Sequence, residues 1–115
     1  MNLTDKKCVP CEGGVPKFSS EEISEYLRQL PAEWSVSGDI KIQKRFIFEN
    51  FVQAIEFVDE VAKLAESEGH HPDIVIYYNK VDILLWTHAI GGLSENDFIV
   101  AAKIEQLPSL KNIKK

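Results

Sequence analysis

Residues 50–88, NFVQAIEFVDEVAKLAESEGHHPDIVIYYNKVDILLWTH, contain the two clearest secondary-structure patterns in the chain. The first half predicts a long amphipathic helix that begins at a capping arrangement of Asn50 and Gln53. Its apolar stripe follows the helical period and consists of Phe51, Ala54, Ile55, Val58, Val61, Ala62 and Ala65. The second half predicts a β-hairpin, with strands over residues 74–78 and 81–87 and a turn at Asn79-Lys80.

The residues before this stretch predict a helix and then another hairpin. Residues 19–22 have the hydroxyl and carboxylate spacing of a capping box, and Pro31 ends the helix. The apolar positions of this helix are Ile23, Tyr26, Leu27 and Leu30. From Trp34 to Phe48 apolar and polar residues alternate around a turn signal at Gly38-Asp39, which indicates a hairpin with one buried face.

A last helix is predicted after the central stretch. Gly91-Gly92 breaks the preceding strand, and Ser94 with Asp97 has capping-box spacing at the start of a helix that runs to Glu105. The order is helix, hairpin, helix, hairpin, helix. This order predicts an α+β fold in which a four-stranded antiparallel sheet has about three helices packed on one face. The other face of the sheet is left for a partner.

Length and composition predict a single globular domain. The chain has 115 residues, of which 44% are hydrophobic and 27% charged. We expect the domain over residues 18–110, a flexible N-terminal arm over 1–17 and a polar, frayed tail over 111–115. A net charge of −5 argues against direct nucleic-acid binding. Neither a membrane-spanning run nor a signal-peptide pattern is present, so we expect a cytoplasmic protein.

The N-terminal arm contains a Cys-Val-Pro-Cys motif, formed by Cys8 and Cys11. A closed zinc site needs four ligands, and no second cysteine pair completes one. The motif precedes a glycine-rich segment, whereas redox CxxC motifs open a helix after a strand. We therefore predict a reduced, non-catalytic pair.

All three histidines of the chain, His70, His71 and His88, lie in one short window. Imidazole exchanges protons near neutral pH, so this clustering suggests acid/base chemistry. Pro72 disfavours helical geometry at His71, and His88 shares a strand face with Trp86. Glu66 stands one helical turn before His70, where it can accept a hydrogen bond from an imidazole.

The same residues have plainer interpretations. Adjacent histidines at the end of a helix can simply complement its dipole. A zinc site built from the three histidines is conceivable, but adjacent imidazoles rarely point at one ion, so we predict no metal. Asp97 serves as the third helical residue of a capping box. Trp34 and Trp86 are either core residues or a stacking surface for a planar heterocycle.

A longer pattern connects these residues. The pattern is Glu66-x-x-x-His70-His71-Pro72, five residues, Tyr78, nine residues, His88, eight residues and Asp97. It resembles the signature of the pterin-4a-carbinolamine dehydratases, a family also known as the dimerisation cofactor of a hepatocyte nuclear factor. The resemblance extends from about Ser19 to Leu107. It includes Leu30-Pro31-x-x-Trp34, Phe46-x-Phe48-x-x-Phe51-x-x-Ala54, Tyr78-Asn79-Lys80-Val81, Thr87-His88 and Gly91-Gly92-Leu93-Ser94.

The resemblance implies a 4a-hydroxytetrahydrobiopterin dehydratase, which removes water from a 4a-hydroxytetrahydropterin to give quinonoid dihydropterin without a metal or redox cofactor. By position, His70 and His88 match the family's acid/base histidines, and which of them is the base stays open. His71 matches the histidine associated with substrate binding and support. The positions expected to bind or orient the substrate are Glu66, Trp34, Pro72 and Asp97.

The resemblance also implies alternatives and partners. Animal members act as dimerisation cofactors of a homeodomain transcription factor, and other members are linked to molybdopterin metabolism. We expect a homodimer or homotetramer and a functional link to an aromatic amino acid hydroxylase. Animal members often have an acidic residue and a cysteine soon after the last histidine, and an arginine just before the final aspartate. Here these positions are Ala89, Ile90 and Asn96.

Overall fold

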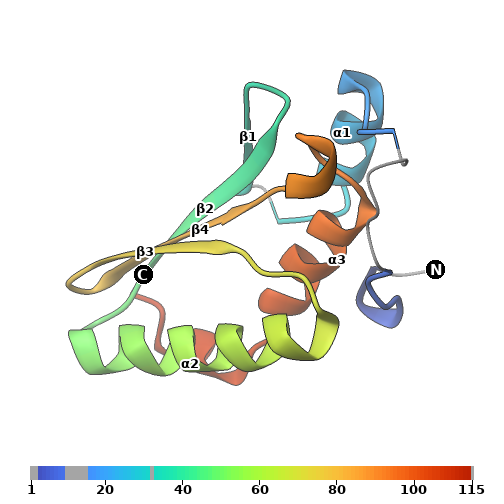
Figure 1. Cartoon of the computed structure of the whole chain (residues 1–115). Coiled ribbons are helices and arrows are strands. Elements are labelled where there is room, and N and C mark those ends of the chain that lie inside the picture. Colours follow the sequence, from blue (N-terminus) through green and yellow to red (C-terminus); the bar gives the residue numbers. More distant parts are fainter. Residues whose placement is uncertain (1–2, 10–15, 32, 115) are drawn as a thin grey trace.

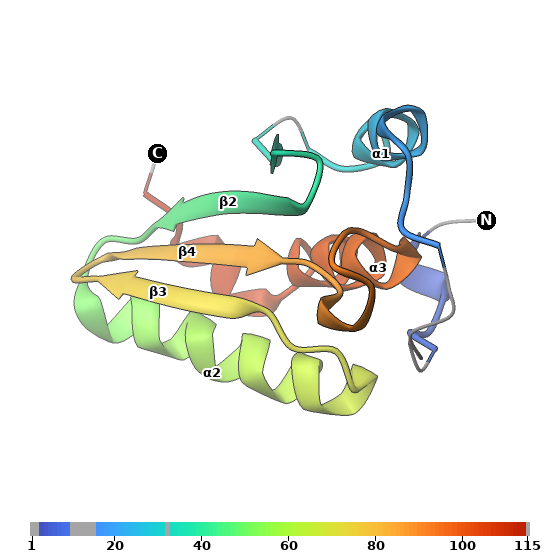
Figure 2. The ribbon, with the colours of Figure 1, turned by 45° about the horizontal axis from the view of Figure 1, so that its top comes forward.

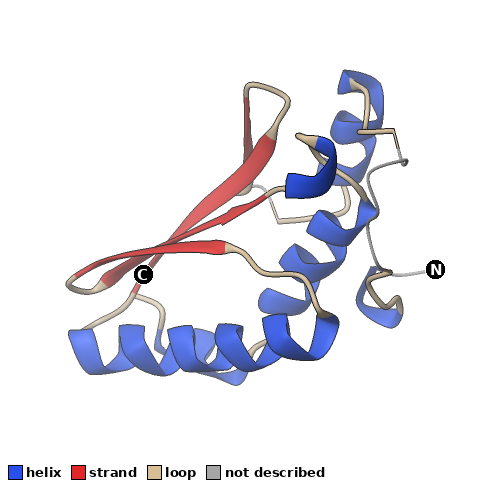
Figure 3. Ribbon diagram, in the orientation of Figure 1, coloured by secondary structure: helices blue, strands red, loops and turns tan. Residues whose placement is uncertain are grey.

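The fold alternates helices and hairpins, as predicted (Figure 1; Figure 3). The structure is a computed structural model and describes residues 3–9, 16–31 and 33–114. Its main elements are α1 (Ser20–Leu27), β1 (Ser35–Ser37), β2 (Lys41–Ile47), α2 (Phe51–Glu68), β3 (Asp73–Tyr77), β4 (Lys80–Leu85) and α3 (Glu95–Ile104). Short 3₁₀ helices lie at Leu3–Asp5, His88–Ile90 and Pro108–Asn112. None of the described helices is long and apolar enough to cross a membrane.

The four strands form one antiparallel sheet in the order β1-β2-β4-β3. Alternation along the two central strands turns one face into the core, and its buried residues are Ile42, Phe46, Val81, Ile83 and Leu85. Helices α2 and α3 lie along this face, and α1 packs against α3 (Figure 2). The predicted α+β architecture is therefore confirmed.

The predicted helix starts are also confirmed. The Ser19 hydroxyl accepts a hydrogen bond from the backbone N–H of Glu22, whose carboxylate accepts one from the N–H of Ser19. The Asn50 side chain accepts a bond from the N–H of Gln53. These caps satisfy backbone donors that the first helical turn leaves unpaired, which is why the local sequence is enough to place them.

The buried face of α2 differs from the predicted one. Phe57, absent from the predicted stripe, is fully buried, and its ring centroid lies 4.7 Å from that of Phe46 and 5.1 Å from that of Phe48. Phe51, which the stripe included, is 49% exposed. The buried residues Ala54 and Val61 lie at the centre of the face, and the helical period places Phe57 beside them while Phe51 lies at the opposite edge, in the first turn.

The second hairpin turns one residue earlier than predicted. Tyr77 pairs with Lys80, so the turn residues are Tyr78 and Asn79 rather than Asn79 and Lys80. Tyr78 adopts a positive φ of 52°, and the buried Asn79 amide donates a 2.8 Å hydrogen bond to the carbonyl of Phe48. This tertiary bond to the end of the first hairpin accounts for the position of Asn79 in the turn.

Both terminal segments contact the domain. Residues 3–9 fall in the predicted flexible arm, yet Leu3 is only 5% exposed and the backbone N–H of Cys8 donates a 2.9 Å bond to Glu68. Cys11 lies outside the described residues, so the reduced, non-catalytic state of the two cysteines stays a prediction. In the predicted tail, Ile113 forms a β-bridge with Phe48 instead of fraying.

We expect Phe57→Ala to lower the free energy of unfolding by about 3–5 kcal/mol, because it leaves a cavity between two buried rings. Phe51→Ala is the matched control, and we expect it to cost less than about 1 kcal/mol because that ring is half exposed. Urea unfolding followed by circular dichroism measures both. Equal losses for the two variants would show that the buried face of α2 is assigned wrongly.

We expect acid to release residues 3–9. Burial opposes ionisation of Glu68, but hydrogen bonds from Cys8 and Lys103 lower its pKa below the ordinary 4.5, and a hydrogen bond from Lys6 lowers the pKa of Glu95. A lowered folded-state pKa contributes stability above the unfolded value, and that stability is lost as the pH falls through the folded value. The Cys8 amide shift in NMR should therefore change below pH 4.5, and Glu68→Gln should weaken that change. A constant shift down to global unfolding would contradict this expectation.

Candidate active site

The end of α2 positions the two adjacent histidines. Gly69 takes a left-handed conformation with φ 65°, which suits glycine. The N–H of Gly69 bonds to the carbonyl of Glu66, and the N–H of His70 bonds to that of Ala65. This C-cap turns the chain away from the helix axis, and Pro72 favours extended geometry at His71 on the way into β3.

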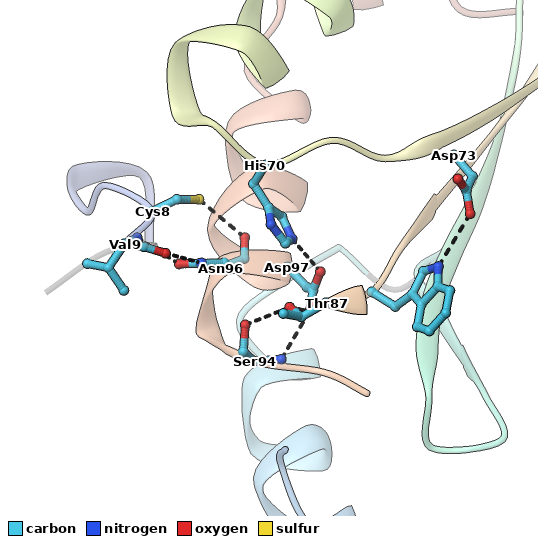
Figure 4. A network of polar contacts seen from close by, with 9 residues as sticks. Cys8, Val9, His70, Asp73, Thr87, Ser94, Asn96 and Asp97 are labelled. Atoms are coloured by element: carbon cyan, nitrogen blue, oxygen red, sulfur yellow. Dashed lines mark hydrogen bonds and ion pairs between the residues drawn. The ribbon is translucent and has the colours of Figure 1, made fainter. Parts of the chain in front are cut away.

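A buried carboxylate holds His70. The Nε2 atom of His70 lies 2.7 Å from Oδ1 of Asp97, whose side chain has no exposed surface, while the His70 side chain is 11% exposed (Figure 4). The other oxygen, Oδ2, accepts bonds from the Ser94 backbone N–H at 3.0 Å and from the Thr87 hydroxyl at 2.8 Å. Asp97 therefore joins the loop after α2, the end of β4 and the start of α3.

This bond selects the tautomer of the neutral His70 ring. An ionised carboxylate only accepts hydrogen bonds, so Nε2 must carry the hydrogen and Nδ1 is left as the acceptor. Asp97 thus caps α3, as its spacing predicted, and also orients an imidazole. Thr87 is a site residue that sequence reasoning gave no role. Only its presence in the family pattern, next to His88, pointed to it.

His88 has a different environment. It opens the 3₁₀ helix that follows β4, two residues beyond Trp86, rather than ending the strand. The two rings lie 4.0 Å apart between centroids with an interplanar angle of 32°. Within the described residues no hydrogen bond holds the exposed His88 ring, whereas the Trp86 indole N–H donates to Asp73 at 3.3 Å. A fixed aromatic wall therefore supports an imidazole that stays open to solvent.

Glu66 contacts an imidazole, but it is that of His71. Nε2 of His71 lies 2.6 Å from Oε1 of Glu66, and the two side chains are 60% and 78% exposed. Helical spacing predicted that Glu66 would contact His70, but the His70 ring points inward to Asp97. Because a solvent-exposed pair is screened, this contact orients His71 without a large gain in stability.

The three histidines line one pocket of about 290 Å³. This volume lies at the lower end for small-molecule sites, so it suits a small planar ligand. The other described lining residues are Val9, Gly69, Trp86, Thr87, Ala89 and Asn96. Two of the positions that depart from animal members of the family, Ala89 and Asn96, therefore line the pocket.

Trp34 and Pro72, which were expected to bind or orient the substrate, are not among the described lining residues. Trp34 is 5% exposed in the core, where its indole N–H donates a 2.7 Å bond to Glu105 and its ring meets Phe46 edge-on. The expected role of Trp34 at the substrate is corrected to one in packing, and Trp86 supplies the indole of the pocket. Pro72 restricts the backbone of His71 to extended geometry.

The histidine nitrogens do not converge on one point. His70 and His71 direct their Nε2 atoms to different carboxylates, Asp97 and Glu66. Across residues 3–9, 16–31 and 33–114, no group of three or more His, Cys, Asp or Glu side chains is arranged to hold a metal ion. The arrangement instead places separate proton-exchanging groups around one small pocket, which is the geometry that acid/base catalysis needs.

We expect Asp97→Ala to lower the free energy of unfolding by about 2–4 kcal/mol, since it removes a helix cap and leaves buried donors unpaired. Asp59→Ala, at an exposed position of α2, is the control and should change the free energy of unfolding by less than about 0.5 kcal/mol. Thermal and urea unfolding give both values. A neutral Asp97→Ala would contradict the structural role of this carboxylate.

Comparisons with known proteins point to one family. The sequence model of the family Pterin 4 alpha carbinolamine dehydratase matches residues 16–107. A protein of Alkaliphilus metalliredigens, provisionally named a pterin-4-alpha-carbinolamine dehydratase, is 47% identical over 94% of this chain and 97% of its own. A relative of the same provisional name from Nitrosospira multiformis is 51% identical over 92% of each chain.

Solved structures give the same result. A Brucella melitensis protein described as a transcriptional coactivator/pterin dehydratase superposes with a TM-score of 0.73 and 35% identity, over 78% of this chain and 96% of that one. A pterin dehydratase-like protein described as a RuBisCO assembly factor superposes with a TM-score of 0.56 and 29% identity, over 64% and 87%. The family match, the relatives and the fold lead to one conclusion: the chain belongs to the pterin-4a-carbinolamine dehydratase family.

Proposed function

We propose that this protein dehydrates 4a-hydroxytetrahydropterins to quinonoid dihydropterins, and so recycles a tetrahydrobiopterin-type cofactor. The observation that carries the proposal is the pocket lined by three histidines, one of them bonded to a buried carboxylate. Membership of the family supports a pterin as the ligand. The small size of the pocket suits a bicyclic heterocycle.

The reaction needs one base and one acid. The base removes the proton on N5 of the pterin, and the electrons of that N–H bond form a double bond between N5 and C4a. The bond between C4a and the hydroxyl oxygen breaks, and the acid protonates this oxygen so that it leaves as water. Proton transfer of this kind contributes about 10²- to 10⁴-fold in rate for each positioned group.

We assign the base to His70. Asp97 leaves Nδ1 of the neutral ring as the proton acceptor, and its buried negative charge stabilises the imidazolium that forms when the proton arrives. His88 takes the role of the acid, because its exposed ring can regain a proton from water after each turnover. His71, paired with Glu66 at the rim, supports binding of the polar edge of the pterin.

The test is to add the purified protein to freshly generated 4a-hydroxytetrahydropterin and to follow formation of the quinonoid product by absorbance. We expect acceleration over buffer, and no acceleration would contradict the proposal. His70→Ala and His88→Ala should each lower kcat by about 10²-fold or more, whereas His71→Ala should mainly raise KM.

The controls for these variants separate chemistry from folding. Circular dichroism and thermal unfolding should show that His88→Ala folds like the unchanged protein, because the ring is exposed. Glu66→Gln keeps a hydrogen-bond acceptor for His71 and should leave kcat within about threefold, since this pair is screened by solvent. A His88→Ala variant of full activity would refute the assignment of the acid.

The uncovered face of the sheet favours a second role in protein association. Ile47, Val75 and Tyr77 lie on this face and are 36%, 38% and 54% exposed. The coactivator and assembly-factor descriptions of the structural relatives fit such a role. The expected homodimer or homotetramer can be measured by size exclusion with light scattering. A stable complex with a second protein, together with no turnover, would show that the main function is protein association and not catalysis.

A further inference from the structure

The N-terminal segment, residues 3–9, ends at the pocket. Several contacts tie it to α3 and to the end of α2. Leu3 is buried in the core, Lys6 forms a 2.6 Å ion pair with Glu95, and the N–H of Cys8 bonds to Glu68. Val9, the last described residue of the segment, is one of the residues that line the pocket.

Asn96 holds the end of this segment by its backbone. Its side-chain N–H₂ donates a 2.6 Å bond to the carbonyl of Val9, and its Oδ1 accepts a 3.1 Å bond from the N–H of Val9 (Figure 4). The Cys8 thiol adds a 3.6 Å contact to the backbone carbonyl of Asn96. The Asn96 side chain thus bonds to both backbone polar groups of Val9, its N–H and its carbonyl, as a neighbouring strand would.

The first turn of α3 connects the clamp, meaning the two hydrogen bonds between Asn96 and Val9, to the histidines. Asn96 directly precedes Asp97, and both are buried, so one rigid turn holds Val9 through Asn96 and His70 through Asp97. The chain is also tied to this region just before α1. The N–H of Phe18 bonds to the carbonyl of Leu93, and Lys17 packs so closely on Gly92 that a Cβ there would lie 2.9 Å from it.

We propose that Val9, held by Asn96, forms a fixed wall of the pterin pocket, and that Asn96 is a positioning residue which sets pterin affinity rather than the rate of the chemical step. This inference rests on the proposed function, since it takes a pterin as the ligand. A preformed wall lowers the cost of ordering the site when the ligand binds. It leaves the pair of His70 and Asp97 unchanged.

Cys8 supplies a readout that does not depend on activity. Burial, followed by the charge and hydrogen bond of Glu68, raises the pKa of its thiol to about 12. The docked thiol is therefore protonated at neutral pH and reacts slowly with thiol reagents, because the thiolate is the nucleophile. Release of the segment would expose the thiol to water and increase its reaction rate.

The experiment compares Asn96→Ala with the unchanged full chain. We expect KM to rise about tenfold, the scale of one or two lost hydrogen bonds, with kcat within about twofold. The dissociation constant of 7,8-dihydrobiopterin, measured by calorimetry, should rise by the same factor. In a Cys11→Ser background, the Cys8 thiol should react with Ellman's reagent about tenfold faster at pH 8.

Two further variants complete the comparison. Asn96→Asp keeps the acceptor for the N–H of Val9 but loses the donor to its carbonyl, so its KM and thiol reactivity should lie between those of the other two proteins. Gln106→Ala, which removes an exposed amide just beyond the C-terminal end of α3, should match the unchanged protein in every measurement.

The outcomes separate this inference from the proposed function. Faster thiol reaction with unchanged dihydrobiopterin affinity would contradict the role of Val9 as a wall of the pocket. Unchanged thiol reactivity would contradict the role of Asn96 in holding the N-terminal segment in place. A fall in kcat without a rise in KM would show that Asn96 acts on His70 instead, and would also overturn the inference. Absent turnover with the expected changes in affinity and thiol reactivity would refute the dehydratase proposal and leave the wall supported.

Discussion

The hydrogen bond between His70 and the buried carboxylate of Asp97 is the contact around which the site is built. A buried charge is costly unless its oxygens are bonded, and here Oδ1 meets His70 while Oδ2 accepts from Thr87 and Ser94. Ser94 and Thr87 lie 3 and 10 residues before Asp97, whereas His70 lies 27 residues before it. Packing of α3 against α2 brings His70 to Asp97, so this one carboxylate contributes both to the start of α3 and to the position of His70.

The first turn of α3 extends this role to its neighbours. Glu95 accepts bonds from Lys6 and from the Tyr26 hydroxyl, and Asn96 binds the backbone of Val9. Three consecutive side chains thus tie the N-terminal segment, α1 and the histidine loop to one rigid element. The N-terminal segment held in this manner places Val9 among the residues that line the pocket.

Where prediction and structure differ, a tertiary contact accounts for the difference. The periodicity of α2 located the helix, but the rings of Phe46 and Phe48 select Phe57 rather than Phe51 for the core. The hairpin turn moved by one residue because the amide of Asn79 binds the carbonyl of Phe48. Composition predicted an arm over residues 3–9. Apart from the buried Leu3, the contacts of this segment with α2 and α3 are hydrogen bonds and an ion pair, which give no periodic pattern in the sequence.

The sequence by itself determined the helices, the hairpins and the caps, because each depends on neighbours within a few residues. It also showed that all three histidines lie in one short window. Only the tertiary structure decided that His70 pairs with Asp97, 27 residues away, that Glu66 pairs with His71, and that Trp86 rather than Trp34 borders the pocket. Side-chain periodicity records which face a residue occupies. It holds no information on which segment packs against that face, and this packing determines which carboxylate each imidazole contacts.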